Sequence, residues 1–442
     1  MYSDNDNVFR LRNYFSESGT RFAKITPQGA ITNDSHTTNL TNVMVDGFVR
    51  NWSTLSIPEE TERLLINVRT RDLIPEGFFS HNLKKLIIDL ESYVDRLVNL
   101  PPNLEMLRIG GEAGNNLNIT EIDLPESLRI LEFSGSYPYR ILDKQLPENL
   151  QVLSFDGLDF RIEEGVLPEN LRELTILDAT RQHFIPGTLP GGLKVLNIGE
   201  YSHDLEPQMF PKGLQELNLY HYFDRKLVPN CLPKGLKSLS ITGGYYFHFI
   251  RAEQFPEGLE TLHIEVYTHQ LEENSLPREL KTLILGEYNL PIEAGVLPTT
   301  LNHLEIDKDF DLEIKPNVLP AGLQVLKLGD YYNQPLRAGV LPTGLKRLKL
   351  GQDYNLPIGV GVLPEGLNLL QLGNSYNQPI GVGVLPEGLN ALYLGEKFNH
   401  LIEPASLPSS LTRLHLTSNY TQTIDSSELP SGVTVIIKPV QN

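Results

Sequence analysis

The sequence predicts a β-rich repeat solenoid, and three observations lead to that prediction. Residues 341–394 read LPTGLKRLKLGQDYNLPIGVGV, LPEGLNLLQLGNSYNQPIGVGV and LPEGLNALYL, which are two complete copies of a 22-residue repeat and the first part of a third. A period of roughly 20–50 residues marks a solenoid, propeller or array. Each phrase also contains the alternation L-x-x-L-x-L of a half-buried strand. Glycine and proline interrupt every phrase, so none offers the uninterrupted run of about ten residues that a helix needs.

Each repeat is expected to begin with a bend. In Leu363-Pro364-Glu365-Gly366 we expect a β-turn in which proline takes the second position and glycine the fourth. Proline also disfavours helical backbone angles at the residue before it, Leu363. The Leu-Pro pair is therefore predicted to start each repeat.

A short strand should follow the turn. Leu370 and Leu372 alternate with polar residues, which predicts one buried and one free strand face. Gly373 ends this strand, and Gly381 and Gly383 make a helical turn unfavourable in the segment that returns to the core. One repeat cannot bury its leucines alone, whereas a stack of repeats can.

Composition narrows the function classes. The chain has 442 residues, of which 40% are hydrophobic and 21% charged, and a formal net charge of −18. This balance is that of a folded chain, and the negative charge argues against a nucleic-acid or anionic-membrane binder. Cys231 is the single cysteine, so the chain cannot form an intramolecular disulfide. With no apolar leader at the N-terminus, we expect a reducing, cytoplasmic location; a secreted repeat protein without disulfides is the alternative.

The sequence of the repeats resembles the leucine-rich repeats and, more narrowly, the FNIP repeat, which is named for Phe-Asn-x-x-Ile followed by Leu-Pro. Here the signature stands as Phe398-Asn399-His400-Leu401-Ile402, and tyrosine replaces phenylalanine at Tyr332-Asn333, Tyr354-Asn355 and Tyr376-Asn377. Such proteins are known from giant DNA viruses (mimivirus-like) and social amoebae. The resemblance implies a leucine-rich-repeat-like arc of about nineteen repeats. Its inner face should be a parallel sheet, with turns, extended segments and short 3₁₀ pieces outside.

The repeats can be followed along most of the chain. Residues 1–36 lack the repeat pattern and are interpreted as an N-terminal cap. Residues 37–442 are predicted to form the solenoid, with a C-terminal strand cap at 430–442. The repeat containing Gly110 and Gly114 is stretched, and a small loop is expected there. The turn prolines lie 21–24 residues apart: Pro101, Pro125, Pro147, Pro168, Pro190, Pro211, Pro233, Pro256, Pro277, Pro298, Pro320, Pro342, Pro364, Pro386, Pro408 and Pro430.

An aromatic residue lies ten positions before each later turn proline. A ladder of exposed rings could stack bases or sugars. The strict coupling to the leucine register favours the other interpretation, a column of rings packed inside the solenoid. The series is Tyr201, Phe223, Tyr246, Tyr267, Tyr288, Phe310, Tyr332, Tyr354, Tyr376, Phe398 and Tyr420.

Little in the sequence points to chemistry. Cys231 occupies a position filled by valine in other repeats, which indicates a core residue rather than a nucleophile. The histidines form no metal spacing, and the glycines do not form a phosphate loop between a strand and a helix. We therefore predict a protein that is not an enzyme and has no catalytic site, no metal and no cofactor.

The residues between the strand leucines should line the inner face, and they vary from repeat to repeat. Five bases and one acid, Asp330, fall between Leu319 and Gln352, which suggests an acidic partner; an ordinary solvated face is the alternative. The five bases are Lys327, Arg337, Lys346, Arg347 and Lys349. The candidate protein-binding residues on this face are Arg108, Glu132, His263, Glu305, Lys327, Arg347, Lys349, Tyr393, Arg413 and His415.

Together these features predict a non-enzymatic protein–protein interaction scaffold that uses the strand-lined face. The alternative is a structural or self-assembling component of a viral particle. The strand Val433–Ile437 offers unpaired backbone and apolar side chains, so a homodimer is expected to form through the C-terminal end. The protein partner is not identified by the sequence, and no nucleic acid or membrane is expected to bind.

Overall fold

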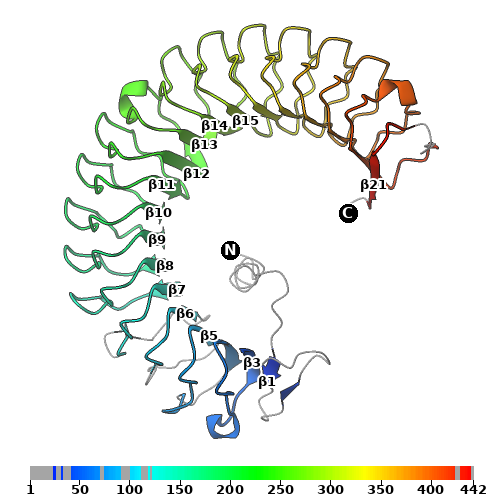
Figure 1. The fold of residues 1–442 in the computed structure, drawn as a ribbon. Coiled ribbons are helices and arrows are strands. Elements are labelled where there is room, and N and C mark those ends of the chain that lie inside the picture. Colours follow the sequence, from blue (N-terminus) through cyan, green and yellow to red (C-terminus); the bar gives the residue numbers. More distant parts are fainter. Residues whose placement is uncertain are drawn as a thin grey trace. The chain divides into compact units, whose positions relative to one another are not determined.

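The structure is a computed structural model that describes residues 23–25, 31–32, 41–69, 74–90, 100–110, 118–119, 122–423 and 429–439. The chain divides into two compact units, residues 1–198 and 199–442. Within each unit the strands line one side of a stack and the turns line the opposite side (Figure 1). The predicted solenoid of parallel strands is thereby confirmed in both units.

Unit 1 is built on parallel strands. Strand β1 pairs in parallel with β3, and from β3 onward each strand pairs in parallel with its successor as far as β10. The one antiparallel pair among the described strands is β1–β2. The strands are β1 (Ala23–Ile25), β2 (Ile31–Thr32), β3 (Asn42–Phe48), β4 (Arg63–Arg69), β5 (Lys85–Leu90), β6 (Met106–Gly110), β7 (Ile130–Tyr137), β8 (Val152–Leu158), β9 (Glu173–Asp178) and β10 (Val195–Gly199).

Strands β1 and β2 are the described part of the predicted N-terminal cap. Because β1 extends the sheet beyond β3, residues 23–25 act as an additional strand rather than as a separate lid. The rest of the predicted cap, and the loop predicted between Gly110 and Gly114, lie outside the described residues apart from Gly110, which ends β6. The cap stays a prediction.

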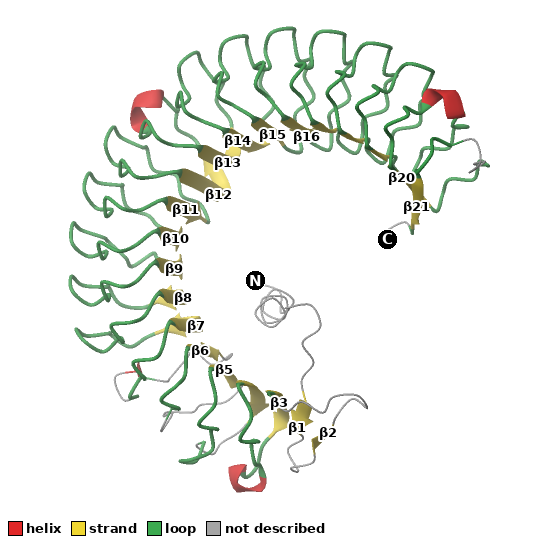
Figure 2. Ribbon diagram, in the orientation of Figure 1, coloured by secondary structure: helices red, strands yellow, loops and turns green. Residues whose placement is uncertain are grey.

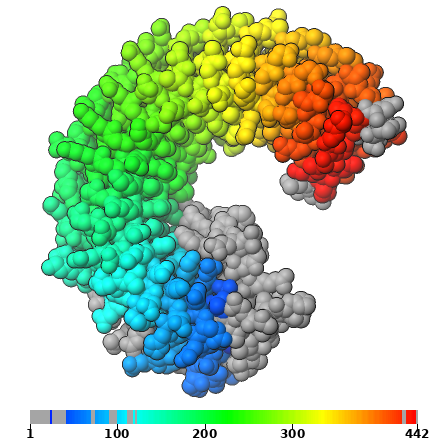
Figure 3. Space-filling view, in the orientation of Figure 1, coloured from blue at the N-terminus to red at the C-terminus, as the bar shows by residue number. Residues whose placement is uncertain are grey.

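In unit 2 every consecutive pair of strands from β11 to β21 is parallel, and the register is continuous except in the β12–β13 pair, where it shifts between Ile241 and Tyr245. The stack curves with its strands on the inside, and the space-filling view keeps that curvature (Figure 3). The strands are β11 (Glu216–Tyr220), β12 (Ser238–Tyr246), β13 (Thr261–Tyr267), β14 (Thr282–Glu287), β15 (His303–Ile306), β16 (Val325–Leu328), β17 (Arg347–Lys349), β18 (Leu369–Gln371), β19 (Ala391–Tyr393), β20 (Arg413–Thr417) and β21 (Thr434–Lys438).

The outer side of the described repeats contains no α-helix, as the glycines and prolines predict. Three short 3₁₀ turns lie entirely within the described residues, η1 (Trp52–Thr54), η3 (Ala252–Gln254) and η4 (Pro404–Ser406), drawn in red in Figure 2. The remaining outer segments are turns and extended chain.

The bend at the start of each repeat is present, but its predicted register is wrong by one residue. The N–H of Leu367 donates to the carbonyl of Pro364 at 3.0 Å, so proline takes the first position of the turn and Gly366 the third. Glycine is favoured at this position because a side chain would collide with the preceding repeat. In the next repeat, for example, a Cβ on the equivalent Gly388 would lie 2.4 Å from the carbonyl oxygen of Glu365. The spacing along one repeat does not reveal that neighbour.

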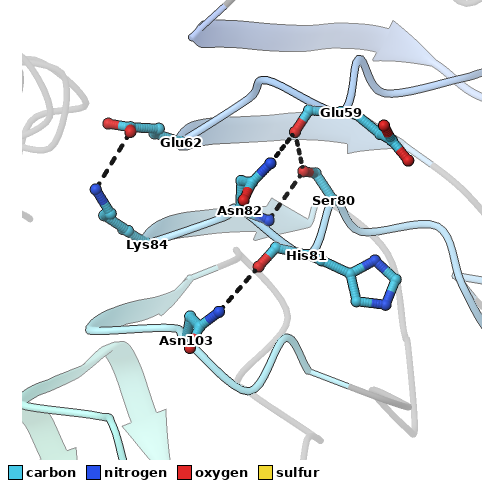
Figure 4. A network of polar contacts seen from close by, with 7 residues as sticks. All are labelled: Glu59, Glu62, Ser80, His81, Asn82, Lys84 and Asn103. Atoms are coloured by element: carbon cyan, nitrogen blue, oxygen red, sulfur yellow. Dashed lines mark hydrogen bonds and ion pairs between the residues drawn. The ribbon is translucent and has the colours of Figure 1, made fainter.

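In several repeats of unit 1, asparagine takes the place of this glycine and makes a bond instead. The Nδ2 of Asn82 donates to the carbonyl of Glu59 at 3.0 Å, and Asn103 donates to His81 at 3.4 Å (Figure 4). Lys84 and Glu62 form an ion pair beside them at 3.2 Å. Such side-chain contacts between consecutive repeats hold the turn side of the stack together.

The aromatic column is confirmed as core. Ten of its eleven members are buried, and Tyr420 is half-buried. Phe310, Tyr332 and Tyr354 stack in nearly parallel planes with ring centroids 6.1 and 6.2 Å apart. Burial raises the pKa of Tyr376 to about 12, which keeps the phenol neutral. Cys231 is buried as predicted, and burial raises the pKa of its thiol.

Candidate protein-binding face

The strands present alternate side chains to opposite sides. In β16, Leu326 and Leu328 are buried, while Val325 and Lys327 are half-buried on the free face. Because the strands pair in register, each free position continues as a column through unit 2. One column runs through Glu305, Lys327, Lys349, Gln371, Tyr393 and His415, and its neighbour runs through His303, Val325, Arg347, Leu369, Ala391 and Arg413.

Two predicted face residues belong to unit 1 and are buried. Arg108 and Glu132 lie opposite each other on β6 and β7, with Nη1 of Arg108 3.8 Å from Oε2 of Glu132. Each side chain is less than one-tenth exposed. This pair contributes to the structure of unit 1 and presents little surface to a partner.

His263 is half-buried on the free face of β13 and contacts the neighbouring strand. Its Nδ1 lies 3.3 Å from the hydroxyl of Ser240 on the neighbouring strand, and burial lowers the pKa of its imidazole. The neutral ring is thereby favoured near neutral pH.

Ion pairs with neighbouring repeats break up the predicted group of five bases. The Nζ of Lys327 lies 2.7 Å from Glu305, and Arg337 donates to Glu313 at 2.8 Å. His303, whose Nε2 lies 3.5 Å from Glu305, and then Lys327 lower the pKa of that carboxyl to about 2. Glu305 therefore neutralises Lys327. This acid lies outside residues 319–352, the range in which the bases and acids were compared.

Three of the predicted cations remain exposed on the strand side. Arg347, Lys349 and Arg413 make no ion pair with any residue that the structure describes. Gln371, Tyr393 and His415 complete the patch, which spans β17 to β20, or ~15 Å at the usual strand spacing. We name these six residues the strand-face strip.

The strip ends in an aromatic pair. The rings of Tyr393 and His415 stack with centroids 4.0 Å apart and an interplanar angle of 9°. Burial, and then the charges of Lys438 and Arg413, lower the pKa of His415. Both ring nitrogens of His415 are shielded from solvent without a hydrogen-bond partner among the described residues. Beside this pair lies a pocket of about 310 Å³, which Gln371 also lines.

A second group of exposed side chains was missed by the sequence analysis. Tyr222, Tyr245, Phe247 and Phe249 are each more than half exposed, although large aromatics are otherwise mostly buried in unit 2. The sequence does contain a sign of this group. The segment GGYYFHF departs from the repeat pattern at positions that asparagine and proline occupy in later repeats.

The described residues form no cluster of three or more His, Cys, Asp or Glu side chains placed to hold a metal ion. Among those residues there is also no helix long and apolar enough to cross a membrane.

Solved structures support the architecture. The chain is similar to CroV588, a giant-virus protein described as a novel circular LRR protein, with a TM-score of 0.70 and 30% identity over 90% of this chain. It spans 59% of the length of CroV588. Similarity to a chain of the mouse RP105/MD-1 complex is in fold alone: the TM-score is 0.60 and the identity 15%, over 91% of this chain and 78% of that one.

The chain has no significant match among curated proteins. The model of the FNIP repeat, in contrast, matches residues 201–244, 248–288, 288–331, 310–353, 332–375, 354–397, 376–418 and 398–437, which together make up more than half of the sequence. The buried aromatic and the asparagine after it are the residues that carry the FNIP signature, and the parallel strands are those of a leucine-rich-repeat solenoid. The chain belongs to the FNIP repeat family.

Proposed function

We propose that the protein is a non-enzymatic scaffold that binds an acidic surface of a protein partner through the strand-face strip. Support comes from one observation above all: Arg347, Lys349 and Arg413 are exposed and have no ion pair among the described residues, although the chain as a whole carries a net charge of −18. Charge complementarity steers association and selects partners. Repeat solenoids of this kind are generally non-catalytic and are commonly used for binding. A cytoplasmic location remains part of the proposal.

The strip also combines features that are enriched in binding surfaces. Arginine and tyrosine are over-represented among the interface residues that contribute most of the binding free energy. Tyr393 is held flat by His415, so its ring loses little conformational freedom when a partner covers it. The short, regular strands β17 to β20 fix the spacing of these groups.

Charge reversal tests this proposal. Arg347→Glu/Lys349→Glu should weaken the complex by at least about tenfold, because each change places an acid against the acidic partner. The matched control, Lys212→Glu/Lys234→Glu, makes the same change in charge at exposed positions directly after the turn prolines Pro211 and Pro233.

Partners would be captured from host-cell lysate with the immobilised wild-type protein and then purified. Each partner would be titrated against the wild type, the strip variant and the control variant at two salt concentrations. A partner that binds the strip variant as tightly as it binds the wild type would contradict the proposal.

The alternative function, a structural component of a viral particle, is favoured by the C-terminal strand. In β21, Ile437 is in register with buried Leu416 and yet is 61% exposed. An apolar strand of this kind is a surface for self-assembly. The similarity to the viral protein CroV588 is consistent with this role.

A further inference from the structure

Four exposed aromatic residues of unit 2 lie in two consecutive repeats, whereas the exposed Tyr331 belongs to a later repeat. Tyr222, Tyr245, Phe247 and Phe249 have exposed fractions of 78, 52, 55 and 52%. Tyr245 stacks on Phe247 with ring centroids 5.3 Å apart, and Phe249 stacks on His269 at 4.1 Å. Burying these rings in the core would stabilise the fold, so their joint exposure is typical of a surface that binds a partner. We name the four residues the aromatic cluster.

The cluster interrupts the rules of the repeat. In most later repeats the position of Phe247 is held by asparagine, whose side chain accepts the next backbone N–H, as Asn355 does from Asn377 at 2.8 Å. A phenyl ring has no acceptor, so the bond to the following repeat is forfeited here. The FNIP repeat model matches the chain up to residue 244 and again from 248, and leaves out Tyr245, Tyr246 and Phe247.

A strained turn carries Tyr222 and lies against Gly243 and Gly244, the two residues before Tyr245. His221 and Tyr222 are consecutive non-glycine residues with φ of 53° and 63°, a region that disfavours L side chains. Gly243 and Gly244 make room for them: a Cβ on Gly243 would lie 2.7 Å from the backbone nitrogen of His221. Strain of this kind is kept where function requires it. It also holds Tyr222 outward, at 78% exposure.

A groove of about 390 Å³ adjoins the cluster. Phe247, Phe249 and Val228 form apolar parts of its wall, and Lys226 and Arg251 add two cations against the single acid Glu253. Neither cation forms an ion pair with a residue that the structure describes. The groove therefore combines apolar walls with an excess of positive charge.

We propose that this groove is a second binding site, separate from the strand-face strip, for an extended acidic segment of a partner protein with an aromatic or aliphatic anchor. The anchor packs between Phe247 and Phe249, and flanking carboxylates meet Lys226 and Arg251. Aromatic residues and arginine are the usual hot spots of such interfaces. Nucleic acid is disfavoured, because the chain carries a charge of −18 and two cations do not make a phosphate track.

Panning a random linear peptide library against the intact protein tests the site. Enriched peptides are expected to combine aromatic or aliphatic residues with aspartate or glutamate. Their synthetic, fluorescein-labelled forms, measured by anisotropy, should bind Phe247→Ser/Phe249→Ser at least about tenfold more weakly than the wild type. The variant Lys226→Glu/Arg251→Glu should weaken the same peptides, and raised salt should weaken binding to the wild type.

Two control variants show whether the loss of binding is specific to this groove. Val360→Ser/Val382→Ser, which also removes exposed apolar side chains, should bind as the wild type does. The strip variant Arg347→Glu/Lys349→Glu should also bind the peptides normally, so the two proposals can fail independently. The inference is overturned if no peptide is enriched, if the enriched peptides lack acidic residues or bind the aromatic variant equally, or if labelled oligouridine binds more tightly.

Discussion

At the scale of single residues, the asparagine of the FNIP signature acts on the next repeat rather than on its own. Oδ1 of Asn333, Asn355, Asn377 and Asn399 accepts the backbone N–H at the same position one repeat later, at 3.0, 2.8, 3.1 and 2.9 Å. Asp311 takes the same role toward Asn333 at 2.9 Å. This bond therefore needs a carboxyl or amide oxygen, and the amide nitrogen is not essential for it.

Replacing Asn355 by alanine should lower the free energy of unfolding by about 1 kcal/mol. The change removes the acceptor for the N–H of Asn377 and for Nε2 of Gln378, which lies 3.1 Å away. Asn355→Asp should restore most of the stability, because it keeps the acceptor. Chemical denaturation measures both variants.

Asn374→Ala is the matched control, since Asn374 is exposed and its side chain donates to Glu396. It should cost less than about 0.5 kcal/mol. An aspartate variant as unstable as the alanine variant would show that the acceptor is not what the position supplies.

At the scale of elements, the end of each strand is set by how closely successive backbones approach. A Cβ on Gly373 would lie 1.7 Å from the carbonyl oxygen of Gly351, and a Cβ on Gly351 would lie 1.6 Å from that of Gly329. No side chain fits at these distances. Glycine after the strand is thus a requirement of the stack in these repeats.

Two glycine substitutions within one repeat should therefore have different effects. Gly373→Ala should destabilise the protein by about 2 kcal/mol or more, because the backbone of β18 and its neighbour must separate. Gly381→Ala should be neutral or stabilise by up to about 1 kcal/mol, since its Cβ would meet only the Val384 side chain at 3.8 Å. Thermal denaturation of the two variants compares them, and equal losses would contradict the role of close backbone approach.

At the scale of the whole molecule, a solenoid is stabilised repeat by repeat, and a terminal rung has a neighbour on one side. Strand β21 is paired with β20 and with no other described strand. Val435 and Ile437 are in register with Leu414 and Leu416, which are buried, yet neither residue of β21 is buried. This rung is the place where self-association is expected.

Light scattering at high protein concentration should accordingly detect a dimer of the intact protein and a monomer of Val435→Lys/Ile437→Lys. Lysine on an edge strand opposes pairing with a second chain. The control Val360→Lys/Val382→Lys introduces the same charge at exposed positions outside the strands and should remain dimeric. A monomeric wild-type protein, or a dimer that persists in the β21 variant, would show the idea to be wrong.

The sequence alone determined the period, the place of the strands within the repeats and the composition of the core, but not strands β1 and β2. These properties depend on contacts that recur in every repeat, so Leu370 or Tyr376 can be placed by spacing alone. The asparagine of the signature was equally visible, although its bond partner was not.

Tertiary structure decided which non-repeating residues are available to a partner. Lys327 and Lys349 occupy equivalent positions, but only Lys327 meets a carboxylate, Glu305, on the strand before it. Such pairs join residues about one repeat apart, and their formation depends on side-chain conformation and on the neighbouring column, neither of which the period encodes. For the same reason the aromatic cluster was missed: hydrophobicity predicts burial, whereas the exposure of Phe247 and Phe249 follows from a local departure of the backbone from the repeat.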